Sequence, residues 1–181
     1  MKGKHSEIIL KGDRVLKRFK PELRYNFLKE SYILTILQPF RFVPRLYSVN
    51  PKRLEIEMEF VKGTFIKDLL NDAETVLESL RICRILDILG IQKEEMTNPY
   101  KHIIKADRVV FVDFERSVFK DRPSNVTQFL SYLNSNLGIF SLKELKEISR
   151  KYKKHFSEEV FNEIFRRVSE SLNNSTQEKT L

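Results

Sequence analysis

Residues 89–117 read LGIQKEEMTNPYKHIIKADRVVFVDFERS, a polar loop followed by two short apolar runs. The runs at residues 102–105 and 109–112 are rich in β-branched residues, and a polar Ala-Asp-Arg segment separates them. Such a pattern is typical of a β-hairpin with a polar turn. We therefore expect a hairpin here, and the rest of the chain is interpreted around it.

Asp113 directly follows the second strand of this predicted hairpin. A carboxylate at a strand exit, beside a loop that carries Glu94, Glu95 and His102, is poorly placed for packing. It is well placed to bind a divalent cation, because such cations take oxygen ligands. An ordinary turn acid is the alternative interpretation of Asp113.

Length and composition predict one compact unit that can divide into two small lobes. The chain has 181 residues, of which 41% are hydrophobic and 11% aromatic, and its net charge is +8. This charge favours polyanionic partners such as nucleotides or nucleic acid, although it also serves solubility. No apolar run approaches the roughly 18 to 20 residues that span a bilayer, and no apolar segment follows the charged start. We expect a cytoplasmic protein with no membrane partner.

Cys83 is the single cysteine of the chain, so an intrachain disulfide is excluded. It lies among apolar residues in a helical pattern, which predicts a buried, inert thiol. The histidines are too scattered to suggest a zinc site.

The first sixty residues alternate between strand and helix patterns. Short strand-like runs at residues 7–10 and 14–19 flank the turn Lys-Gly-Asp at 11–13. A near-helical apolar spacing then predicts a helix over residues 21–38, which begins at a proline and stops before another. Two further strand-like runs follow at residues 46–49 and 54–61, and the second alternates cleanly between apolar and acidic residues.

The later part of the chain is mainly helical in pattern. We expect Thr64 to cap a short helix over residues 65–70, and a longer helix to end at Gly90. Further helices are predicted at residues 126–137, 141–155 and 157–172, with Ser141 and Glu144 spaced as a capping box. From Asn173 the chain loses apolar periodicity, and we expect a disordered tail over residues 173–181.

The polar loop and its surroundings resemble small, atypical, archaeal-type members of the protein-kinase-like superfamily. Residues 90–96, GIQKEEM, align with the Gly-Ile-x-His-Gly-Asp-Leu loop of these kinases, and residues 113–115, DFE, fall where they carry Asp-Phe-Gly. The chain is similar to RIO-like and tRNA-modification-associated small kinases. It departs from them because Glu95 replaces the catalytic Asp, His102 stands where Asn is expected, and the loop is about two residues longer.

The resemblance implies an α+β, two-lobed fold. The N-lobe would comprise residues 1–61, with a small antiparallel sheet and the helix at 21–38. The reduced, mainly helical C-lobe would comprise residues 62–172, with the catalytic loop at 90–102. Only about ten residues separate Asp113 from the following helices, which is too few for a long activation segment.

The resemblance also assigns roles to individual residues in a site for ATP and Mg²⁺. Lys17, in a Val-x-Lys motif, would bind the nucleotide phosphates and pair with Glu30 of the helix; Lys20 and Arg18 compete for the first role and Glu22 for the second. The backbone of Glu59 and Val61 would contact the adenine edge. Glu95 would be the catalytic base, with Glu94 as its competitor. Lys101 would lie near the γ-phosphate, although Thr97 occupies the strict alignment position. Asp113 and His102 would be metal ligands.

Three functions remain open from the sequence. The first is an atypical serine/threonine kinase that transfers a phosphoryl group to an unknown protein or small-molecule acceptor. The second is a nucleotide-binding pseudokinase. The third is an RNA-associated scaffold, suggested by a basic helical cluster that comprises Lys143, Lys146, Arg150, Lys151, Lys153, Lys154, Arg166 and Arg167.

Overall fold

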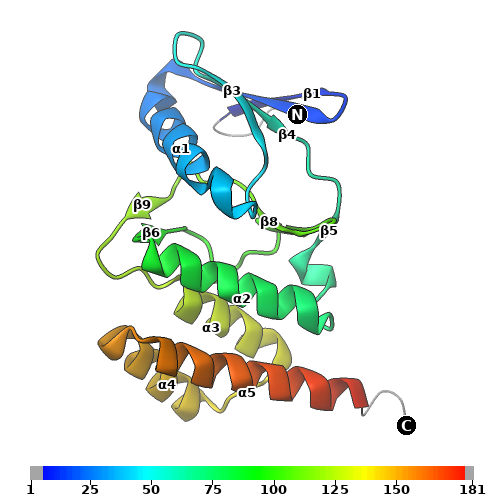
Figure 1. Cartoon of the computed structure of the whole chain (residues 1–181), viewed down its shortest axis with the longest axis vertical. Helices are drawn as coiled ribbons and strands as arrows, with labels where there is room; N and C mark the ends of the chain where they lie inside the picture. Colours follow the sequence, from blue (N-terminus) through cyan, green and yellow to red (C-terminus); the bar gives the residue numbers. More distant parts are fainter. Residues whose placement is uncertain (1–5, 178–181) are drawn as a thin grey trace. The chain divides into compact units, whose positions relative to one another are not determined.

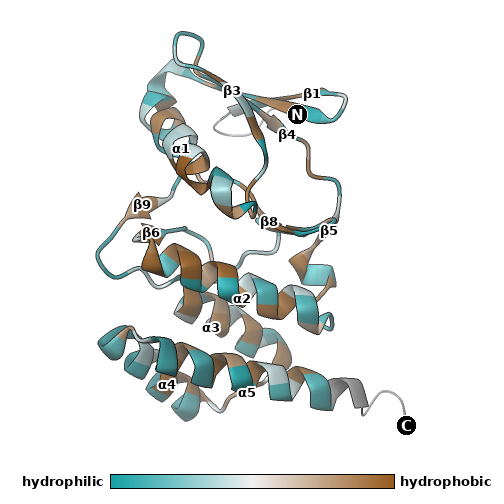
Figure 2. Ribbon diagram, in the orientation of Figure 1, coloured by the Kyte–Doolittle hydropathy of each residue, from teal (hydrophilic) through white to brown (hydrophobic). Residues whose placement is uncertain are grey.

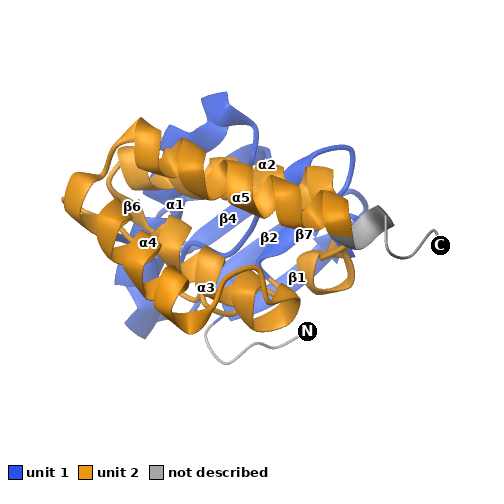
Figure 3. Ribbon diagram, turned by 90° about the horizontal axis from the view of Figure 1, so that it is seen from below, with its two compact units in different colours: residues 1–64, 102–118 blue, residues 65–101, 119–181 orange. Residues whose placement is uncertain are grey.

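The computed structural model describes residues 6–177, and the chain divides into two compact units that Figure 3 colours separately. Unit 1 contains the chain up to Thr64 together with His102–Val118, and unit 2 contains Phe65–Lys101 together with the chain from Phe119 onward. The sequence suggested one boundary after Val61, whereas residues 102–118 group with the N-terminal part. The described residues form an α+β protein.

Unit 1 is built on a four-stranded antiparallel sheet with the order β1-β2-β4-β3 (Figure 1). The predicted first hairpin is confirmed, and Gly12 occupies its turn with a φ of 64°, a conformation that glycine adopts without steric cost. The elements of unit 1 are β1 (Ser6–Lys11), β2 (Arg14–Phe19), a 3-10 turn (Pro21–Leu23), α1 (Arg24–Leu37), a 3-10 turn (Gln38–Phe40), β3 (Leu46–Asn50), β4 (Glu55–Glu59), β7 (Ile103–Lys105) and β8 (Val109–Phe111).

Helix α1 contacts strands β2, β3 and β4 and buries one apolar face (Figure 1). Phe27 packs edge-on against Phe19 of β2, with ring centroids 5.8 Å apart. The buried side chains of α1 follow the helical repeat that the sequence predicted, because residues three and four apart share a face. They are Phe27, Glu30, Ser31, Ile33, Leu34 and Leu37.

The second predicted hairpin, β7–β8, is also confirmed as an antiparallel pair. It joins unit 1 because the backbone N–H of Phe111 donates a 2.7 Å hydrogen bond to the carbonyl of Phe42. Gly63 lies against the same hairpin, where a β-carbon would overlap the carbonyl oxygen of Lys105. A glycine is therefore required at residue 63 by this close backbone approach.

Unit 2 consists mainly of helices. Helix α2 contacts α3 and α5, and α4 contacts both α3 and α5. Cys83 is fully buried on α2, as predicted. The elements of unit 2 are a 3-10 turn (Ile66–Asp68), α2 (Ala73–Ile88), β6 (Ile91–Gln92), α3 (Asn125–Leu137), α4 (Leu142–His155) and α5 (Glu158–Gln177), while the short strands β5 (Thr64–Phe65) and β9 (Val118–Phe119) lie at the junctions of the units.

Helix α4 is strongly amphipathic and is largely teal on the face visible in Figure 2. Within the helix, Ile148 and Tyr152 are the buried residues, four positions apart on one face. The capping box is confirmed: the Ser141 hydroxyl accepts from the N–H of Glu144, and the Glu144 carboxylate accepts from the N–H of Ser141. Helix α4 carries six of the basic residues grouped in the sequence, and α5 carries Arg166 and Arg167.

Two boundary predictions were wrong. The short helix expected over residues 65–70 is a single 3-10 turn at Ile66–Asp68, and Thr64 lies in a strand and does not cap it. Helix α5 continues to Gln177, so the tail predicted to be disordered from Asn173 is helical to that residue; its last four residues lie outside the described part of the chain. Polar residues at the end of a long helix need no apolar repeat, because the helix is nucleated elsewhere.

Glu144 should make the folding stability of unit 2 depend on pH. Hydrogen bonds from Ser141 and Arg167 lower the pKa of the Glu144 carboxyl from 4.5 to about 2. A carboxylate with a lowered folded-state pKa stabilises the fold above its unfolded pKa, and that stabilisation is lost as the pH falls. We expect Glu144→Gln to lower the melting temperature at pH 7, with the difference from wild type shrinking between pH 4.5 and about 2.

The matched control for this experiment is Glu147→Gln, an exposed glutamate on the same helix. Its melting temperature should follow the wild-type curve at every pH. A Glu144→Gln difference that stays constant down to pH 2 would contradict the assignment of this pH dependence to Glu144.

Within the described residues, none of the helices is both long enough and apolar enough to cross a bilayer.

Candidate functional site

Lys17 and Glu30 are buried, paired charges inside unit 1. Lys17 lies in the middle of β2, which pairs with β1 on one side and β4 on the other. Glu30 lies on the buried face of α1. Their exposed fractions are 6% and 1%. Lys17 Nζ donates a 2.7 Å hydrogen bond to Glu30 Oε2, so the ion pair expected between these residues is present.

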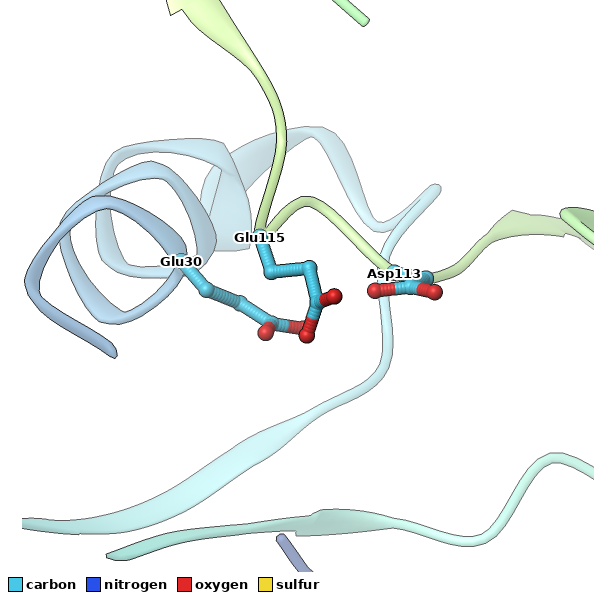
Figure 4. Close-up of side chains that lie close together, drawn as sticks. All are labelled: Glu30, Asp113 and Glu115. Carbon is cyan, nitrogen blue, oxygen red and sulfur yellow. The ribbon is translucent and has the colours of Figure 1, made fainter. Parts of the chain in front are cut away.

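Lys17 Nζ contacts two further carboxylates. It lies 3.1 Å from Asp113 Oδ1 and 3.1 Å from Glu115 Oε2. One ammonium therefore faces three acidic side chains, whose oxygen atoms lie within 4.8 Å of one another. Figure 4 shows Glu30 and Glu115 approaching each other, with Asp113 on the same loop as Glu115. We call these four residues the Lys17 cluster.

Electrostatics keep the lysine charged. Burial opposes the positive charge of Lys17, but the carboxylates of Glu30, Asp113 and Glu115 outweigh it and raise the pKa of the ammonium. Burial raises the pKa of the Glu30 carboxyl, with Lys17 acting in the opposite direction. The Lys17 cluster carries more negative than positive groups, which makes it attractive to a further cation.

The segment after β8 brings Asp113 and Glu115 to the lysine. Asp113 has a φ of 64°, which is uncommon for a residue with a side chain. The carbonyl of Glu115 accepts a 3.3 Å hydrogen bond from Asn26 Nδ2, which holds Glu115 against α1. Phe114, which stands between Asp113 and Glu115 in the sequence, is fully buried. Backbone conformations of this kind are concentrated at functional sites, where the surrounding structure maintains them.

A cavity of about 390 Å³ opens beside the Lys17 cluster, and every residue that lines it belongs to unit 1. This volume lies within the range of small-molecule sites. Glu59 and Val61, whose backbone groups were predicted to contact adenine, line this cavity. Apolar side chains from four strands and from connecting segments line it as well. The full lining is Ser6, Ile8, Val15, Lys17, Glu30, Pro44, Met58, Glu59, Phe60, Val61, Ile104, Val112, Asp113 and Glu115.

The competitors for Lys17 and Glu30 lie elsewhere in unit 1. Arg18 points to the other face of the sheet, where it binds Glu55 at 2.7 Å. Lys20 and Glu22 are exposed and do not line the cavity. Alternation along β2 separates Lys17 from Arg18, because successive strand residues point to opposite faces.

His102 does not line the cavity and is not in the acidic group around Lys17. Its carbonyl accepts a 2.9 Å hydrogen bond from the N–H of Val112 next to Asp113. Glu115 is the residue that joins Asp113 at Lys17, and no role for it was predicted from the sequence. The signal was available in residues 113–115, where an acidic residue replaces the expected glycine. A metal-binding role for His102 stays a prediction.

The predicted catalytic residues belong to unit 2. Glu95 is exposed and has a φ of 70°, the same uncommon conformation as Asp113. Its neighbour Glu94 lies 4.0 Å from Lys120, and Lys101 is exposed with its Nζ 5.2 Å from the Tyr100 ring centroid. Roles for Glu95 and Lys101 in catalysis stay predictions.

A buried polar network, which the sequence did not predict, holds the start of the loop that carries Glu95. The Asp87 carboxylate accepts hydrogen bonds from the N–H and Nδ2 of Asn125, the N–H of Val126 and the Tyr152 hydroxyl, at 2.7 to 3.2 Å. Asn125 Oδ1 in turn accepts a 2.8 Å bond from the N–H of Lys93. Asp87 thus caps α3 and holds Asn125 against the segment before Glu95.

Arg84 extends this network within unit 2. Its guanidinium donates to the Tyr152 hydroxyl at 2.8 Å and to the Phe156 carbonyl at 3.2 Å. Burial raises the pKa of the Asp87 carboxyl, and the donors from Asn125, Val126 and Tyr152 oppose that rise. A buried carboxylate with this many donors is stabilised only as a complete network.

The basic helical cluster is mostly solvent-exposed. Lys143, Lys146 and Arg150 are exposed on α4, whereas Lys151 forms a 2.6 Å ion pair with Glu163 and Arg167 pairs with Glu144. These ion pairs join α4 to α5 and neutralise part of the positive charge of the basic cluster.

Comparison with known proteins finds similarity to an uncharacterized protein of Methanocaldococcus jannaschii. The two are 28% identical over 115 residues, which cover 54% of this chain and 99% of the relative. No protein-family model matches the chain.

The chain is also similar to the KEOPS complex subunit Bud32 of Pyrococcus abyssi. The identity is 29% over 129 residues, which cover 64% of this chain and 57% of Bud32. The chain therefore matches little more than half the length of that relative. This distant similarity points to the protein-kinase-like superfamily.

Proposed function

We propose that this protein is an atypical kinase that binds Mg·ATP in unit 1 and transfers the γ-phosphoryl group to a hydroxyl acceptor. The observation that carries the proposal is Lys17, which is 2.7 Å from Glu30 and 3.1 Å from Asp113 at the side of a mainly apolar cavity. A buried lysine suits the phosphates, and the apolar cavity suits a purine ring. The similarity to Bud32 supports the superfamily, whereas substrate and acceptor rest on this proposal.

The residues present fit Mg²⁺. Asp113 and Glu115 offer oxygen ligands, which Mg²⁺ prefers, and Asp113 has a 43% exposed side chain that a cation can reach. Bound at these carboxylates, Mg²⁺ would neutralise phosphate charge. Because the Lys17 cluster already has an excess of acidic groups, we expect nucleotide phosphates to be repelled unless the cation accompanies them.

Each residue of the proposed site would have its own role in the transfer. Lys17 would bind phosphate oxygens while Glu30 keeps its ammonium in place. The acceptor oxygen would form a bond to the γ-phosphorus as the bond to the leaving ADP breaks, and Glu95 would take the acceptor proton. The acceptor is a protein or a small molecule with a free hydroxyl group.

Thermal melting of the full chain tests nucleotide binding. We expect millimolar ATP with Mg²⁺ to raise the melting temperature by about 5 to 11 °C, because a ligand present at 100 times its Kd adds about 2.7 kcal/mol to the free energy of unfolding. ATP without Mg²⁺ should produce a much smaller shift. Asp113→Asn should remove most of the Mg²⁺-dependent part.

The control is Asp121→Asn, an exposed aspartate that leaves the cavity unchanged. It should respond to Mg·ATP as wild type does. An unchanged melting curve for wild type, with and without Mg²⁺, would reject the nucleotide proposal.

A further inference from the structure

A second cavity of unit 1, about 570 Å³ in volume, is lined by arginine and aromatic side chains. We call it the arginine cavity and define it by Arg41, Arg45, Arg108 and Tyr47. The first two lie in the segment between α1 and β3, Tyr47 lies on β3, and Arg108 lies in the β7–β8 turn. None of these residues lines the cavity beside Lys17.

The charges of the arginine cavity are unevenly compensated. Of its two acidic residues, Glu59 forms a 2.6 Å ion pair with Arg108, and Asp13 lies 4.0 Å from Arg14. Arg41 and Arg45 are both exposed, and among the residues that the structure describes no carboxylate lies within ion-pair distance of their guanidinium groups. Two positive side chains are therefore available to an anionic ligand.

The backbone that presents these two arginines is held by hydrogen bonds on both sides. Arg108 Nε donates a 2.8 Å bond to the carbonyl of Arg41, which has a φ of 60°. The carbonyl of Arg45 accepts from the N–H of Glu59 at 2.8 Å, and its N–H donates to the Glu59 carboxylate at 2.9 Å. A site held in place before binding loses less entropy when a ligand arrives.

The Gln38 side chain completes this frame. Its Nε2 donates to the carbonyls of Leu34 and Pro44, and its Oε1 accepts a 2.9 Å bond from the N–H of Leu46. The segment from the end of α1 to the start of β3 is thereby fixed at both ends. Arg41 and Arg45 are the exposed side chains on this fixed segment that line the cavity.

Tyr47 adds an aromatic surface to the cavity. Tyr47 is 36% exposed, and the Arg14 guanidinium lies over its ring at 4.1 Å from the ring centroid. Stacked tyrosine and arginine planes are the groups on which nucleobases pack in single-stranded complexes. An acidic peptide would use the arginines and leave the aromatic ring without a role.

We propose that the arginine cavity binds single-stranded nucleic acid, with backbone phosphates on Arg41 and Arg45 and a base stacked at Tyr47. The volume of about 570 Å³ is in the range of sites that enclose a nucleotide-sized ligand. This binding does not depend on the proposed kinase activity, because the two cavities use different charged groups except for Glu59, which lines both.

Fluorescence anisotropy of the full chain with labelled oligouridine of about ten nucleotides tests the proposal. We expect Arg41→Ala/Arg45→Ala to weaken binding about tenfold at low salt, and to reduce the slope of log K against log salt by about 1.4, or 0.7 for each lost phosphate contact. Tyr47→Leu should weaken binding at least about fivefold through lost stacking. Oligothymidine run in parallel shows whether RNA or DNA is preferred.

The control variant Lys143→Ala/Lys146→Ala removes the same charge from α4 in unit 2 and should change binding less than about twofold. Polyphosphate, which has charge but no bases, should compete poorly and should not distinguish Tyr47→Leu from wild type. The proposal is overturned if wild type does not bind at low salt, if polyphosphate competes as well as oligouridine, or if the α4 variant loses as much binding as the arginine variant. Melting curves of each variant identify any that fails to fold.

Discussion

Asp113→Asn is expected to lower the rate of phosphoryl transfer from ATP at least about a hundredfold, because it removes the exposed carboxylate of the Lys17 cluster. Asparagine tolerates the φ of 64° found at residue 113, so the backbone should stay as it is. The readout is transfer of labelled γ-phosphate to the protein itself or to added acceptors. A variant that keeps the wild-type rate would remove Asp113 from the proposed site.

Glu95→Gln should reduce the same rate by a factor of about a hundred or more, which is the usual contribution of a general base. The matched control is Glu94→Gln, which loses only a 4.0 Å contact with Lys120 and should stay near wild type. Loss in Glu94→Gln instead would transfer the role to that residue. ATP binding without transfer in any protein, wild type included, would indicate a pseudokinase.

Asp87→Ala is expected to destabilise the protein by about 3 to 5 kcal/mol, the usual cost of removing one partner from a buried charged network. The substitution would leave buried donors of Asn125, Val126 and Tyr152 without their acceptor. For a chain of this length the melting temperature should fall by about 10 °C. Chemical denaturation measures the free energy of unfolding directly.

Two further variants isolate the cause of this loss. Tyr152→Phe removes one donor to Asp87 and the acceptor of Arg84, and it should cost about 1.5 to 3 kcal/mol. Asp121→Ala, an exposed aspartate of the same unit, should be nearly neutral. A small loss in Asp87→Ala, comparable to that of Asp121→Ala, would contradict a structural role for the network.

Local patterns determined most of the secondary structure. The turn at Gly12, the strands of both hairpins, the span of α1 and the Ser141 capping box follow from alternation, helical spacing and turn chemistry within a few residues. Helix ends were harder, as the single 3-10 turn at Ile66–Asp68 and the extension of α5 to Gln177 show. Helix boundaries depend on contacts beyond the local sequence.

The sequence by itself supplied the order Lys17, Glu30 and Asp113, and the resemblance to small kinases paired the first two. Their burial is a result of the tertiary structure, because Lys17 stands between Leu16 and Arg18 in a strand whose pattern does not mark it as buried. Only the tertiary structure placed Glu115 on the same lysine, and only it joined Asp87 to Asn125 and Tyr152. Arg41, Arg45 and Tyr47 belong to no motif in the sequence, and only the fold places them around one cavity with Arg108. Contacts such as Lys17 to Asp113, 96 residues apart, are made by chain segments whose approach depends on the packing of the whole unit, which no local pattern records.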